Sequence, residues 1–143
     1  MITFQVTMDA ADPDRLARFW AEMLGYKLQD PPPGFDTWEA WAEQQGIPKE
    51  RWNDFSALID PEGKRARFFF QRVPEPKTTK NRVHLDVNAC GPHGTPPDER
   101  AANVKAAVAR ATGLGATVLY EKEEMGSRWV TLADPEGNEF CIQ

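Results

Sequence analysis

The sequence is poor in cysteine, serine and histidine, and it contains no long hydrophobic run. Its two serines, Ser56 and Ser127, lie outside any G-x-S-x-G motif, which excludes the nucleophile elbow of the α/β-hydrolases. No stretch of about 18 apolar residues occurs, and this excludes a membrane-spanning helix. Phosphate-binding loops and dinucleotide fingerprints are also absent. These absences remove several classes of protein before any residue is given a role.

The charge of the chain is mildly acidic and mixed. There are 17 Lys and Arg against 22 Asp and Glu, a net charge of −5, and no basic stripe, so we expect no nucleic-acid partner. Residues 1–5 lack the basic and apolar regions of a signal peptide, so a cytoplasmic protein without a membrane partner is expected. In that reducing compartment, Cys90 and Cys141 are expected to be free thiols. The 143 residues suit one compact domain.

Two segments carry complete helix signals. The first opens at Asp12-Pro13-Asp14, where a capping residue, a proline and an acid follow one another, and it ends at Gly25. Its apolar stripe consists of Leu16, Phe19, Trp20, Met23 and Leu24. The second opens at Thr95-Pro96-Pro97-Asp98 and ends at Gly113 or Gly115.

Strand patterns surround both helices. In the first half, alternating or β-branched segments predict strands at 4–9, 26–29, 55–59 and 67–73. In the second half, the same signals predict strands at 82–88, 117–121, 129–133 and 139–142. Each half therefore has the order strand, helix, strand, strand, strand.

A turn motif repeats at the same place in each half. Asp60-Pro61-Glu62-Gly63 returns as Asp134-Pro135-Glu136-Gly137, each time between two expected strands, and both are typical turn sequences. A repeated turn within a repeated element order indicates an internal duplication. We therefore expect an α+β fold of two tandem βαβββ modules, 1–76 and 80–143, within a single domain over residues 1–143.

The first strands of the two halves align. This alignment places Gln5 opposite His84 and Thr7 opposite Asp86. Strand alternation gives the second-half strand one polar face, formed by Arg82, His84, Asp86 and Asn88, and one apolar face, formed by Val83, Leu85 and Val87. The equivalent polar face of the first half holds Gln5, Thr7 and Asp9, with Phe69 and Gln71 from the fourth strand. A polar cluster of this kind bonds to itself, to water or to a ligand.

An insertion at 31–54 interrupts the first module and contains three tryptophans. A short helix is expected to start at Asp36-Thr37-Trp38-Glu39 and to end at Gly46, with Trp38 and Trp41 on one face. Two interpretations stay open for these indoles. They either pack on the sheet as additional core or form the aromatic wall of a lid over a ligand.

Several motifs together resemble the vicinal oxygen chelate superfamily. They are Phe19-Trp20-Ala21-Glu22-Met23-Leu24-Gly25-Tyr26, the terminal Asp134-Pro135-Glu136-Gly137-Asn138-Glu139-Phe140, and the segments 68–77 and 80–87. Within that superfamily, the chain more closely resembles bacterial glyoxalase-like domain proteins, and the resemblance spans nearly the whole chain. The resemblance implies that the two modules build a cup-shaped sheet around a site. The superfamily includes lyases, dioxygenases, fosfomycin-resistance enzymes and bleomycin-binding proteins, so the resemblance is specific for fold rather than for activity.

The resemblance also implies four positions for metal ligands. In this sequence they fall on Gln5, Gln71, His84 and Cys141, where glyoxalase I-like lyases carry His or Gln, Glu, His and Glu. Both glutamates are absent, and with them the family's base and two of its anionic ligands. We therefore expect no tightly bound metal, and neither glyoxalase I activity nor extradiol cleavage.

The function favoured by these residues is binding of a small organic ligand between the modules, with His84 and Asp86 available for acid–base chemistry. The expected ligand-binding residues are Gln5, Thr7, Phe69, Gln71, Arg82, Trp38, Trp41 and Cys141. Two alternatives stay open. One is a divalent-metal-dependent lyase, isomerase or dioxygenase that uses Gln5 and His84 with Gln71 or Cys141. The other is a bleomycin-type antibiotic-binding protein. Under each of these interpretations, the protein could form a homodimer.

Overall fold

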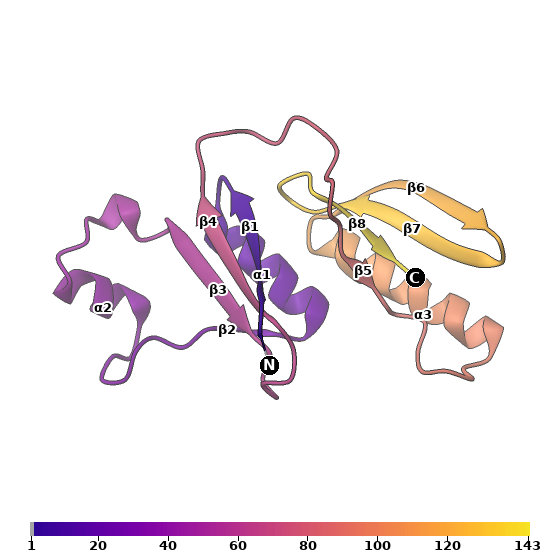
Figure 1. The fold of residues 1–143 in the computed structure, drawn as a ribbon, viewed down its shortest axis with the longest axis horizontal. Helices are drawn as coiled ribbons and strands as arrows, with labels where there is room; N and C mark the ends of the chain where they lie inside the picture. Colours follow the sequence, from indigo (N-terminus) through magenta and orange to yellow (C-terminus); the bar gives the residue numbers. More distant parts are fainter. Residues whose placement is uncertain (1) are drawn as a thin grey trace. The chain divides into compact units, whose positions relative to one another are not determined.

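The computed structural model describes residues 2–143. The chain forms two compact units, each with a four-stranded sheet and a long helix (Figure 1). Unit 1 extends to Pro76, and unit 2 comprises Lys77–Gln143.

Unit 1 contains one sheet with the strand order β1-β4-β3-β2. Its elements in chain order are β1 (Gln5–Ala10), α1 (Pro13–Leu24), β2 (Lys27–Leu28), α2 (Trp38–Gln44), the 3-10 helix η1 (Lys49–Arg51), β3 (Phe55–Ile59) and β4 (Arg67–Arg72). β1 and β4 pair in parallel, whereas the other pairs are antiparallel. The first and last strands of the module are therefore neighbours in the sheet.

Helix α1 begins and ends where its local signals predict. The Asp12 side chain accepts a hydrogen bond from the backbone N–H of Arg15 at 3.2 Å, and Pro13 occupies the first turn. Gly25 ends the helix with φ of 68°, a left-handed conformation that side chains with a Cβ adopt at a cost. The predicted helix is confirmed.

One face of the unit 1 sheet packs against α1. Trp20 of α1 stacks on Phe68 with ring centroids 6.5 Å apart, and Phe68 stacks in turn on Phe70. All three side chains are buried. Because side chains alternate along a strand, the residues between them on β4 lie on the opposite, helix-free face.

The insertion folds into α2 and η1, between β2 and β3 (Figure 1). Its helix begins one residue later than the sequence indicated: Thr37 rather than Asp36 is the cap, and its hydroxyl accepts from the N–H of Ala40 at 3.1 Å. Trp38 donates its indole N–H to the carbonyl of Gln29 at 2.7 Å. Ala42 is the buried residue of α2, so the helix adds little to the core.

Unit 2 repeats the arrangement of unit 1. Its elements are β5 (Asp86–Val87), α3 (Pro97–Gly113), β6 (Thr117–Glu124), β7 (Ser127–Ala133) and β8 (Glu139–Ile142), and its strand order is β5-β8-β7-β6. The first and last strands, β5 and β8, again pair in parallel. The predicted α+β fold with two βαβββ modules is confirmed.

The expected strand at 82–88 is wrong in its extent, because β5 is only Asp86–Val87. Val83, predicted to lie on the apolar face of this strand, is exposed. The reason is the length of the neighbouring strand. β8 begins only at Glu139. The backbone N–H of Asn81 is therefore bound by the side chain of Glu139 and not by a backbone carbonyl of a paired strand. The chain therefore reaches β5 through bends at Arg82 and Val83, without regular strand pairing.

Candidate functional site

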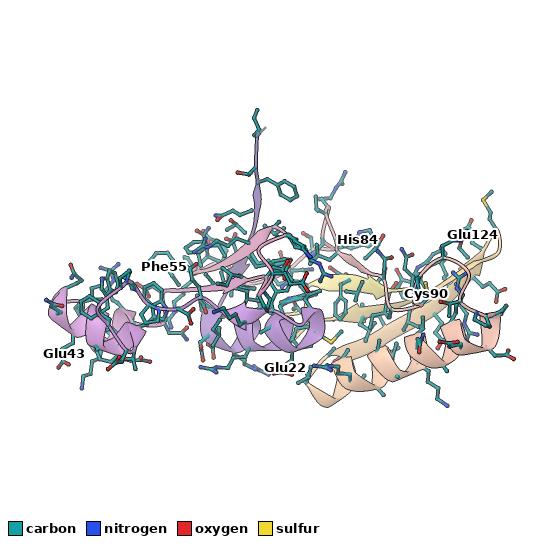
Figure 2. All side chains as sticks on the ribbon, turned by 90° about the horizontal axis from the view of Figure 1, so that it is seen from below. Glu22, Glu43, Phe55, His84, Cys90 and Glu124 are labelled. Carbon is teal, nitrogen blue, oxygen red and sulfur yellow. The ribbon has the colours of Figure 1, made fainter. Side chains whose placement is uncertain are left out.

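Three side chains capable of binding a metal converge in unit 2. Asp86 of β5 is in register with Cys141 of β8, and His84 lies two residues before Asp86, on the segment that leads into β5. One ligand atom from each of His84, Asp86 and Cys141 lies within 4.8 Å of the other two. We call these three residues the His84 cluster. Figure 2 shows His84 on the segment that leads into β5.

The His84 cluster is buried at one end and open at the other. The Cys141 residue is 8% exposed, whereas the side chains of His84 and Asp86 are 46% and 48% exposed. His84 Nε2 lies 3.4 Å from Asp86 Oδ1, and the Cys141 sulfur lies 3.5 Å from the hydroxyl of Thr131 on β7. The thiol thus lies at the buried end of a site whose imidazole and carboxylate are accessible to solvent.

The segment before β5 is held to β8 by Glu139. Its carboxylate accepts from the N–H of Asn81 at 2.9 Å and from the ammonium of Lys77 at 3.0 Å. These two hydrogen bonds hold the pKa of Glu139 below its usual value, and the bond from Asn81 has the larger effect. Further along, the N–H of Cys141 donates to the carbonyl of Leu85 at 2.9 Å. Glu139 therefore fixes the approach of the chain to His84.

We expect Glu139→Gln to destabilise the protein by about 1–2 kcal/mol near neutral pH, because it removes a partly buried charged acceptor. Since the folded-state pKa is lowered, the contribution of Glu139 is present above its ordinary value of 4.5 and is lost as the pH falls through the folded-state pKa. Stability below pH 4.5 should therefore fall less steeply in the variant, as measured by urea unfolding across pH.

Glu62→Gln is the matched control, because Glu62 forms an exposed ion pair with Lys64. It should change stability by less than about 0.5 kcal/mol. Equal effects of the two substitutions would show that Glu139 does not hold the segment in place.

In unit 1, the predicted polar residues form two separate pairs. Gln5 donates to the hydroxyl of Thr7 at 3.3 Å, and Gln71 donates to the carboxylate of Asp9 at 2.8 Å. Gln5 pairs across the sheet with Arg67, whereas Gln71 pairs with Asp9 at the other end of β1. Gln5 and Gln71 therefore lie at opposite ends of the paired strands β1 and β4.

The strand registers of the two units identify which residue of unit 1 corresponds to Cys141. Thr7 pairs with Phe69 in unit 1, and Asp86, its counterpart in the duplication, pairs with Cys141 in unit 2. Phe69 rather than Gln71 therefore occupies the duplicated position, and a phenyl ring binds no metal. The ligand set of the His84 cluster comes from unit 2 alone.

The remaining predicted ligand-binding residues lie outside the His84 cluster. Arg82 is exposed on the segment before β5. Trp38 and Trp41 pack edge to face on each other in α2, with ring centroids 5.5 Å apart. Arg67, which was not predicted as a site residue, donates to the amide oxygen of Gln5 at 2.8 Å. Alternation on β4 gave a signal for it, since Arg67 shares a face with Phe69.

The donor chemistry of the His84 cluster fits a divalent cation of the zinc type. Imidazole nitrogen, thiolate sulfur and carboxylate oxygen are the ligands that zinc takes in proteins, and three of them leave a position for a further ligand. The expectation of no metal rested on the two missing glutamates. Asp86 supplies a carboxylate from a different position, so the donor set of this chain is compatible with a metal.

The duplicated modules and the side chains gathered on their first and last strands define a two-module α+β protein of the vicinal oxygen chelate class. A family model described as Glyoxalase-like domain matches residues 5–143, and the chain belongs to this family. The resemblance stated from the sequence is thereby confirmed. No curated protein matches the chain.

Solved structures share the fold at low sequence identity. A glyoxalase/bleomycin resistance protein/dioxygenase family enzyme from Burkholderia phytofirmans is 16% identical, with a TM-score of 0.62 and coverage of 96% of this chain and 94% of that one. A variant of the fosfomycin resistance protein FosX from Listeria monocytogenes, in complex with Mn(II) and 1S,2S-dihydroxypropylphosphonic acid, is 10% identical, with a TM-score of 0.63 and coverage of 100% and 90%. Identities this low establish the fold alone.

Two further properties follow from the described residues. Between residues 2 and 143, none of the helices is both long enough and apolar enough to cross a membrane. Cys90 and Cys141 are both free thiols, as the sequence indicated.

Proposed function

We propose that the chain binds a small oxygen-bearing organic ligand at the His84 cluster, together with a zinc-type divalent cation held by His84, Asp86 and Cys141. The observation that carries the proposal is the convergence of one nitrogen, one oxygen and one sulfur ligand atom within 4.8 Å of one another. Support also comes from the fold, since a solved structure that shares it contains Mn(II) and a phosphonic acid.

The three side chains have distinct tasks in this proposal. Cys141 supplies a ligand from the buried base of the site, and thiolate is a preferred zinc ligand. His84 and Asp86 supply ligands from the open end, so an organic molecule reaches the same position from solvent. A bound cation polarises an oxygen of such a ligand as a Lewis acid.

Zinc should raise the melting temperature of the protein, because an ion that binds only the folded state stabilises it by mass action. At a free Zn²⁺ concentration of about 100 times Kd, the expected stabilisation is about 2.7 kcal/mol. Differential scanning fluorimetry with buffered Zn²⁺ measures the shift, and a chelator should reverse it. The absence of any shift with Zn²⁺, Co²⁺ or Ni²⁺ would contradict a metal site.

A second candidate function needs no metal and rests on the contact between His84 and Asp86. His84 Nε2 lies 3.4 Å from Asp86 Oδ1, and a carboxylate beside an imidazole orients the ring. An imidazole beside a carboxylate at this distance is a candidate for proton transfer to or from a bound ligand. In chelator-treated protein, a ligand found by NMR screening should lose affinity in both His84→Gln and Asp86→Asn. Unchanged affinity in both variants would contradict this candidate.

A further inference from the structure

Arg67 is held in one orientation on the helix-free face of the unit 1 sheet. Its Nε donates to the side-chain oxygen of Gln29 at 2.7 Å, and its Nη1 donates to the side-chain oxygen of Gln5 at 2.8 Å. The guanidinium also lies over the ring of Phe69, 5.1 Å from the ring centroid. Three neighbours thus fix a side chain that is normally flexible.

The charge of Arg67 is not neutralised by a carboxylate. Both of its hydrogen-bond acceptors are neutral amides, and within residues 2–143 no salt bridge of Arg67 is found. Other arginines of the chain do pair with carboxylates, namely Arg18, Arg51, Arg72 and Arg128. Since a guanidinium carries several N–H groups, Nη1 and Nη2 still have N–H groups that can donate to an anion.

An aromatic surface adjoins this cation. Phe55 of β3 stacks on Phe69 with ring centroids 5.6 Å apart and an interplanar angle of 21°. Phe55 is 58% exposed, so its ring is accessible to a flat partner from solvent. A fixed cation and an exposed ring therefore both contact one phenyl group, that of Phe69.

We propose that this face of unit 1 binds a planar aromatic carboxylate, with the carboxylate on Arg67 and the aromatic ring against Phe55. Charge placement on the sheet supports this orientation. Asp9, the acidic residue of β1, lies four residues beyond Gln5, about 13 Å along the strand, and it accepts from Gln71. The anionic end of the ligand is thus directed to the Arg67 end of the sheet. All of these residues belong to unit 1, so the proposal does not depend on the His84 cluster.

The test compares 2-naphthoate with 2-naphthalenemethanol, which keeps the aromatic rings but lacks the charge. Binding to the full chain is measured by isothermal titration calorimetry and by amide chemical-shift changes, with a chelator present. We expect the acid to bind at least about tenfold more tightly than the alcohol, because hydrogen bonds to charged groups are the stronger ones. In Arg67→Gln this preference should disappear.

Arg72→Gln is the matched control, because Arg72 lies on the same strand with the opposite alternation and pairs with Asp54. It should keep the preference for the acid. A second variant, Phe55→Leu, should weaken both the acid and the alcohol and leave their ratio unchanged. Amide spectra of each variant report whether the fold is retained.

Three results would overturn the proposal: no binding of 2-naphthoate at millimolar concentration, equal affinity for acid and alcohol, or a preference that survives in Arg67→Gln. His84→Ala separates this proposal from the metal site. Retained 2-naphthoate binding in that variant supports an independent site, and loss of binding there contradicts it. A protein that binds 2-naphthoate but no zinc would leave this inference standing and would contradict the metal site.

Discussion

Replacing His84 by alanine should lower the affinity for Zn²⁺ by at least about a hundredfold. Removing even an outer-shell partner of a metal ligand costs about 10–100-fold in affinity, and His84 is itself a ligand in the proposed site. The variant leaves only Asp86 and Cys141, whose atoms belong to two neighbouring strands. Competition against a chromophoric chelator measures the change in affinity.

The chain contains its own control for this substitution. It has two histidines, and His93 lies outside the His84 cluster, in the loop between β5 and α3. His93→Ala should leave zinc affinity unchanged. If His84→Ala binds zinc as the unsubstituted protein does, or if both variants lose affinity equally, the ion is bound elsewhere.

The second large effect is expected in the core of unit 1. Trp20→Ala should destabilise the protein by about 3–5 kcal/mol, the cost of removing a buried aromatic side chain and leaving a cavity. Trp20 is 1% exposed, stacks on Phe68 and contacts Phe19 edge to face at 5.4 Å. Urea unfolding followed by circular dichroism gives the difference in free energy.

Trp38→Ala is the matched control, because it removes the same side chain from a site that is 41% exposed. We expect it to cost less than about 1.5 kcal/mol, mainly the edge-to-face contact with Trp41 and the hydrogen bond to the Gln29 carbonyl. Equal costs for the two tryptophans would mean that α1 does not form the core of unit 1.

The helices and several strands could be predicted because their signals are local. Asp12, Pro13 and Gly25 act on the backbone within one turn, so α1 begins and ends as expected. The strands at 55–59 and 139–142 are correct to the residue. The strand at 82–88 was overestimated, because its extent depends on a partner strand that is distant in the sequence.

The candidate site was predicted only in part for the same reason. Alternation placed His84 and Asp86 on one face from their spacing alone. The approach of Asp86 to Cys141 depends on the register between β5 and β8, which no local pattern gives. Arg67 was missed because its fixed orientation arises from Gln5 and Gln29, two residues on other segments of the chain.

The most direct test of the His84 cluster is the absorption spectrum of the protein titrated with Co²⁺, which binds at zinc-type sites and reports its ligands. We predict a thiolate-to-cobalt charge-transfer band in the near ultraviolet that saturates at a stoichiometric amount of cobalt. The band should persist in Cys90→Ser and disappear in Cys141→Ser and in His84→Ala. A spectrum without the band, or a band lost in Cys90→Ser and kept in Cys141→Ser, would contradict a metal site formed by His84, Asp86 and Cys141.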